Sequence, residues 1–197
     1  TEYLSHHDSM AGNVRNNASW IEARWTNSNL NSLTTTGPIH MMDPAVYAWK
    51  HFHPDVMIEE IELTDEGGAG VHGYLFVASK ATALTSGGYR YDYCVQNFNS
   101  DDSVGSFNVP GNCSPSNVFF RDVDHHSGSP WDNTDWTLNQ TGGGLDWSTQ
   151  TFAQNAYANA IRWGTVFTFC FEADSQPGVA QATLGLSKSA GSHNATV

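Results

Sequence analysis

The chain is poor in positive charge. Eight Lys and Arg residues stand against 20 Asp and Glu residues in a total of 197, which gives a formal net charge of -12. Nucleic acids and anionic membrane surfaces bind clustered basic side chains, so we expect neither kind of partner. The sequence also lacks an apolar run of about 18 residues, the length that a membrane-spanning helix needs. We therefore expect no membrane span.

Cysteine is scarce as well. The three cysteines are Cys94, Cys113 and Cys170, and no C-x-x-C pair occurs. An odd number cannot complete a disulfide framework, and the spacing typical of zinc or haem attachment is missing. Cys94 and Cys113 flank a connection rich in Gly, Asn and Ser, which makes them candidate disulfide partners. Cys170 alternates with Phe residues and is expected to be a buried free thiol.

Aromatic and small polar residues are abundant instead. The chain has ten Phe, seven Tyr and seven Trp, while only 14% of its residues are charged. Low charge combined with many Asn, Ser, Thr and Gly residues is typical of extracellular β proteins. We therefore expect a secreted or cell-surface protein.

Alternating patterns predict most of the secondary structure. In residues 89–97 Tyr89, Tyr91, Tyr93 and Val95 share one face, and in 163–173 three Phe residues alternate with Val, Thr and Cys, as in strands with one buried face. Gly-, Asn- and Ser-rich turns separate the other expected strands, at 18–26, 56–63, 71–81, 105–109, 118–126, 145–152 and 178–186. Asp43-Pro44 begins a short predicted helix that ends near Trp49. The pattern predicts an all-β, mainly antiparallel β-sandwich, jelly-roll-like, with at most short helices.

The domain organisation follows from length and periodicity. Residues 1–17 are polar and aperiodic, which predicts an extended N-terminal arm. Residues 18–197 have the length of one β-sandwich and are expected to form a single domain.

Several stretches together resemble a known protein family. They are YDYCVQNFNSDDSVGSF, FFRDVDHHSGSPWDNTDW and TFAQNAYANAIRWGTVFTFCFEAD. In this combination they resemble the C-terminal β-rich region of a family of large secreted bacterial proteins, and the resemblance covers most of the chain. Asp102 stands where the family has Arg, and His125 where it has Tyr. The family has no established activity, so the resemblance implies a β-rich architecture and export and says nothing about catalysis.

The stretch 118–136, VFFRDVDHHSGSPWDNTDW, holds most of the candidate ligands for metal ions. If 118–126 is extended, Asp122, Asp124 and His126 share one face. With His51 and His53 they would form a site for Cu, Zn or Fe. Alternatively, oxygen ligands from this stretch would wrap Ca²⁺, namely Asp122, Asp124, Asp132, Asn133 and Asp135. A third reading is that these Asp residues only stabilise turns.

The same stretch offers a sugar-binding surface. Exposed aromatic rings stack on the apolar faces of sugars, and nearby amides bind the hydroxyl groups. Trp131, Trp136 and Asn133 are the candidates for this role. The alternative for the two Trp residues is core packing.

Evidence for catalysis is weak in the sequence. Glu59, Glu60 and Glu62, or Asp122 with Asp124, are candidate acid/base pairs of the kind that glycosidases use. The motifs G-x-S-x-G and H-E-x-x-H and a phosphate-binding Walker loop do not occur.

Three functions remain open. The first is a non-catalytic extracellular module that binds glycan or matrix, or that assembles with other protein subunits, including copies of itself. The second is a metal-dependent secreted enzyme that acts on a polymer through the His/Asp site. The third is a structural subunit of a filament or surface layer, in which residues 1–17 would donate a strand to a neighbouring subunit.

Overall fold

The computed structural model describes residues 18–64, 71–111, 114–125, 128–142, 144–189 and 191–197. The chain divides into two compact units, Thr1–Pro54 and Asp55–Val197. The range predicted as a single domain, 18–197, spans parts of both units, and its being one domain stays a prediction. The predicted arm, 1–17, lies outside the described residues.

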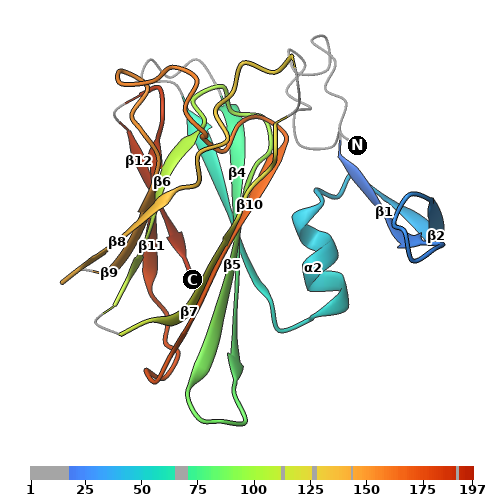
Figure 1. Cartoon of the computed structure of the whole chain (residues 1–197), viewed down its shortest axis with the longest axis horizontal. Coiled ribbons are helices and arrows are strands. Elements are labelled where there is room, and N and C mark those ends of the chain that lie inside the picture. Colours follow the sequence, from blue (N-terminus) through green and yellow to red (C-terminus); the bar gives the residue numbers. More distant parts are fainter. Residues whose placement is uncertain (1–17, 65–70, 112–113, 126–127, 143, 190) are drawn as a thin grey trace. The chain divides into compact units, whose positions relative to one another are not determined.

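The first unit contains a β-hairpin and a helix (Figure 1). Strand β1 (Ser19–Trp25) pairs antiparallel with β2 (Leu33–Met41), and helix α2 (Val46–Phe52) follows. Trp20 stacks on His40 with ring centroids 3.7 Å apart, and its Nε1 donates to Asp43 Oδ2 at 2.8 Å. Strand β2 was not predicted, because its Thr-Thr-Thr-Gly-Pro core lacks alternating apolar residues.

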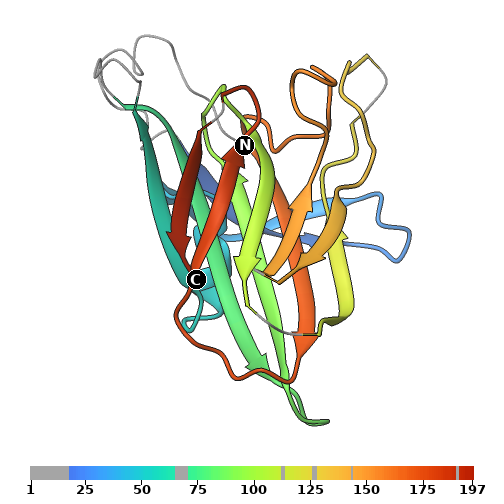
Figure 2. The same ribbon diagram turned by 90° about the vertical axis from the view of Figure 1, so that its left-hand side faces the viewer.

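The second unit is an antiparallel β-sandwich, which confirms the predicted fold class. One sheet has the order β3 (Met57–Thr64), β4 (Val71–Ala83), β5 (Tyr89–Asn97), β10 (Thr165–Ala173) and β7 (Ser116–Arg121). The other has the order β12 (Ser192–Thr196), β11 (Gln181–Leu186), β6 (Val104–Pro110), β9 (Gly144–Ser148) and β8 (Thr137–Thr141). Figure 2 shows the strands of this unit extending between two sets of connecting loops.

The core of the sandwich is aromatic. Phe107 of β6 lies 4.9 Å from Phe169 of β10, and Trp147 of β9 lies 5.4 Å from the same ring, all measured between ring centroids. All three side chains are almost completely buried. The alternation of Phe in 163–173 was thus a correct guide to the buried face of β10.

Among the predicted boundaries that differ from the structure, two affect the candidate site. The strand expected over 118–126 ends at Arg121, so Asp122 and Asp124 do not lie on a strand face. Helix α2 extends to Phe52, so His51 is helical and does not share an extended face with His53. Among the described residues, no helix has the length and apolar character needed to cross a membrane.

Candidate functional site

Polar and aromatic loops gather at one end of the sandwich, which we call the loop end. Its described residues are 98–103 between β5 and β6, 122–125 and 128–136 between β7 and β8, 149–164 between β9 and β10, and 187–189 after β11. The hydrogen bonds described below join these loops to one another. Residues that are distant in the sequence are therefore held close together by a network of hydrogen bonds between the loops.

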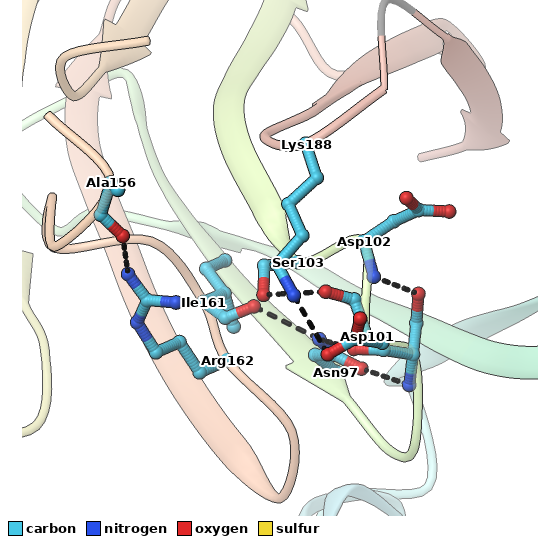
Figure 3. A network of polar contacts seen from close by, with 9 residues as sticks. Asn97, Asp101, Asp102, Ser103, Ala156, Ile161, Arg162 and Lys188 are labelled. Carbon is cyan, nitrogen blue, oxygen red and sulfur yellow. Dashed lines mark hydrogen bonds and ion pairs between the residues drawn. The ribbon is translucent and has the colours of Figure 1, made fainter. Parts of the chain in front are cut away.

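The side-chain amide of Asn97 forms several of the hydrogen bonds in this network. It ends β5 and is completely buried. Its Nδ2 donates to the carbonyls of Ser100 and Ile161 at 2.9 and 3.0 Å, and its Oδ1 accepts from Ser100 N at 2.8 Å (Figure 3). A single amide thus closes the 98–103 turn and attaches it to the 149–164 loop. Nearby, Lys188 reaches Asp101, with Nζ 2.8 Å from Oδ1.

Asn159 has a similar role for the loop 122–136. Its side chain is completely buried, and Nδ2 donates to Asp122 Oδ2 and, at 3.1 Å, to the Thr134 carbonyl. Its main-chain carbonyl accepts the indole N–H of Trp136. The bond to Asp122 attaches the chain to the 149–164 loop directly after β7 ends at Arg121.

An aromatic pair lies on the surface of the loop end. The rings of Trp131 and Tyr157 have centroids 5.9 Å apart and planes inclined by 48°. The Arg162 guanidinium carbon lies 3.5 Å from the centre of the Trp131 ring, a cation–π contact. Arg162 is itself held by the carbonyls of Ala158 and Ala156, at 2.8 and 3.3 Å. The Trp131 ring therefore packs against a guanidinium group whose position is fixed by hydrogen bonds, while Tyr157 is 55% exposed.

Asp132 connects the two loops that carry this pair. Its main-chain N–H donates to the Tyr157 carbonyl at 2.8 Å. Its carboxylate accepts from the hydroxyl and main-chain N–H of Thr134, at 2.6 and 2.8 Å, and from Asn155 Nδ2 at 3.3 Å. The hydrogen bonds from Thr134 lower the pKa of Asp132, so this carboxylate is ionised at neutral pH. An anionic acceptor therefore stands beside the aromatic pair.

The structure places the three residues predicted to bind sugar in different environments. Trp131 belongs to the surface pair. Trp136 is only 5% exposed and packs against Phe120, Phe167 and Phe169, so it is a core residue and does not reach a ligand. The Asn133 amide forms two hydrogen bonds with the backbone of His125, at 2.8 and 3.2 Å, and so holds the loop.

The residues predicted to bind metal do not converge in the part of the chain that is described. There, no group of three or more His, Cys, Asp or Glu side chains is arranged to hold an ion. His51 packs against Trp20 and His40 in the first unit, whereas Asp122 bonds Asn159 in the second. Asp124, Asp135 and His53 are exposed. His126 lies outside the described residues.

The structure separates the members of most candidate acid/base pairs. Glu59 and Glu60 are consecutive in β3, so their side chains point to opposite faces of the sheet. Glu62 shares the face of Glu60 on the same edge strand. Asp122 is engaged by Asn159, and Asp124 is exposed outside any strand.

The cysteines of the sheet are free thiols. Cys94 of β5 is unpaired, and Cys113, its predicted partner, lies outside the described residues. Cys170 of β10 is a buried free thiol, as expected. Burial raises the pKa of Cys94 to about 12 and that of Cys170 to about 11. Neither thiol is a nucleophile at neutral pH.

Tyr157 and Arg162 were not identified as site residues from the sequence. They lie in the stretch NAYANAIR, which has no strand or helix periodicity and no recognised motif. Their only signal is an aromatic and a basic residue in an otherwise small, neutral segment. The two residues are recognised as part of the site only because the fold places this segment beside Trp131.

Comparison with known proteins adds no relatives, since no protein-family model, curated protein or solved structure matches this chain.

Proposed function

We propose that the protein is a non-catalytic extracellular module that binds a glycan at the loop end. The observation that carries this proposal is the Trp131–Tyr157 pair, inclined by 48° and backed by Arg162. Sugars present apolar C–H faces to aromatic rings and hydroxyl groups to polar side chains. The loop end supplies both in adjacent positions.

The surrounding polar groups suit a neutral sugar. Asp132 and Asn155 lie beside the pair, joined by a hydrogen bond of 3.3 Å. Carboxylate and amide oxygens accept more than one hydrogen bond, so both groups retain capacity for hydroxyl donors. The net charge of -12 disfavours uronic acids and sulfated sugars through repulsion. Because the loops are already bonded together, little ordering is needed on binding.

A glycan array followed by calorimetry with the best ligand tests this proposal. We expect Tyr157→Ala and Trp131→Ala each to weaken binding at least tenfold, about 1.4 kcal/mol. Phe119→Ala is the matched control, because Phe119 is 51% exposed but lies on β7 outside the loop end. Binding that survives both substitutions at the pair, or that is lost equally in the control, would contradict the proposal.

The alternative of subunit assembly depends on residues 1–17, which lie outside the described residues. Its test is separate: removal of these residues should abolish assembly and leave the sandwich folded.

A further inference from the structure

A cavity lies at the end of the sandwich opposite the loop end. It has a volume of about 410 Å³ and is lined by Asp55 and the start of β3, by the distal ends of β4, β5, β6 and β10, by residues 175–180 and by Val197. Strands β5, β6 and β10 each run from one end of the sandwich to the other, which separates this cavity from the Trp131–Tyr157 pair. Pockets for small molecules typically measure about 300–1,000 Å³. The cavity is therefore of ligand size and lies entirely within the second unit.

Three aromatic rings in its lining are nearly parallel. Tyr91 and Phe171 are cross-strand partners, with ring centroids 5.0 Å apart and planes 17° apart. Tyr93 continues the set, 6.2 Å from Phe171 and inclined by 18°. Aromatic rings favour offset stacking, so a row of parallel rings selects a flat partner that extends it. A bulky saturated molecule would form weaker contacts with these rings, because it cannot stack on them.

Polar groups in the lining fix its shape and balance its charge. The Tyr91 hydroxyl donates to the Ser175 carbonyl, which holds the segment after β10 against β5. The charged side chains of the lining are Lys80 and Asp55, and they form an ion pair with Nζ 3.0 Å from Oδ1. A charged ligand would have to compete with this pair. An uncharged ligand would not.

We propose that this cavity binds a small, flat, uncharged aromatic molecule at the row formed by Tyr91, Phe171 and Tyr93, where it stacks on Tyr91, the half-buried end member of the row. The occupant is a free small molecule, because the lining is built by one unit around a ligand-sized space. The site goes beyond glycan binding at the loop end and does not depend on it.

Titration of the full chain with 2-naphthol, followed by NMR, tests the proposal. We expect saturable shifts at residues of the lining and nuclear Overhauser effects from naphthol protons to the rings of Tyr91 and Phe171. Ala81→Phe, which places a ring in the lining, should weaken binding at least tenfold. Thr82→Phe is the matched control, because it adds the same ring to the next residue of β4, on the opposite face of the sheet.

Saturated decahydro-2-naphthol provides the control for flatness, and we expect it to bind at least tenfold more weakly than 2-naphthol. The wild-type Overhauser effects keep the test decisive even if a variant folds poorly. Absence of saturable shifts in the wild-type protein would overturn the proposal. Equal binding of the saturated compound, or equal weakening by Thr82→Phe, would overturn it as well.

Discussion

Two buried amides, Asn97 and Asn159, hold the loop end together. Both side chains are completely buried, and each bonds groups from a different loop. An amide donates and accepts hydrogen bonds at the same time, whereas an ionised carboxylate only accepts. Asn159 uses its donor side toward the carboxylate of Asp122 and the carbonyl of Thr134. A change of this one group therefore alters the attachment of the loop that carries Trp131.

We predict that Asn159→Asp destabilises the protein at neutral pH by about 2–4 kcal/mol, since it buries a second carboxyl beside Asp122. Burial and the neighbouring charge raise the folded-state pKa of the new carboxyl above its unfolded value of about 3.9. Its relative stability is therefore greatest below pH 4 and falls as the pH rises through the raised pKa. Urea unfolding at pH 3.5 and pH 7 measures the difference.

Asn194→Asp serves as the control for that substitution. Asn194 is exposed, and its Oδ1 accepts a hydrogen bond from Thr183 Oγ1 at 3.1 Å, which a carboxylate oxygen also does. A loss of stability in the Asn159 variant that is independent of pH would contradict the electrostatic explanation.

At the level of elements, the β8–β9 hairpin depends on a close approach at Gly144. This residue begins β9 with φ 141°, and a Cβ placed on it would lie 2.2 Å from the Val109 carbonyl oxygen of β6. We predict that Gly144→Ala lowers the free energy of unfolding by about 2–4 kcal/mol through backbone strain and overlap. Gly142→Ala in the same hairpin meets nothing within 4 Å and should have little effect. Thermal unfolding of both variants tests this, and equal effects would contradict it.

The central strands β5 and β10 also determine thiol reactivity. With pKa values of about 12 and 11, Cys94 and Cys170 hold less than about one part in a thousand as thiolate at pH 8. We predict that iodoacetamide leaves both unmodified in the folded protein at pH 8 and modifies both in guanidinium. Peptide mass spectrometry under non-reducing conditions measures this. A bond from Cys94 to Cys113 would instead block Cys94 in the unfolded chain and support the disulfide predicted from spacing.

At the level of the whole molecule, the chain consists of two units that we expect to differ in thermodynamic stability. The second has two five-stranded sheets around an aromatic core, whereas the described part of the first has one hairpin and a seven-residue helix. A two-stranded sheet without a sizeable core is marginal in water. We predict that a chain of residues 55–197 folds alone with one cooperative transition, and that residues 1–54 do not. Circular dichroism and calorimetry test this, and a non-cooperative transition for 55–197 would contradict it.

Much of the fold was predictable because strand patterning is local. The alternation of Tyr in 89–97 identified β5 with its correct bounds, and that of Phe in 163–173 identified the buried face of β10. Strands β2, β8 and β12 were missed, since their polar sequences give no alternation. These strands form through pairing with neighbours rather than through their own apolar faces.

The candidate site was predictable only in part. The sequence identified Trp131 by its polar loop, but the same reasoning selected Trp136, which the fold buries. Whether a Trp in such a loop faces solvent depends on where the next strand begins, and β8 begins directly after Trp136.

The sequence by itself determined the fold class, the aromatic strands of the core, the net negative charge and the low proportion of charged residues. Composition can be counted directly, and the alternation of apolar residues shows which face of a strand is buried. Only the tertiary structure decided which side chains meet. Tyr157 and Arg162 reach Trp131 from a loop far along the chain, and Tyr91, Tyr93 and Phe171 align across two paired strands. Such neighbours depend on sheet order and register, which are set by long-range pairing and have no local signature in the sequence.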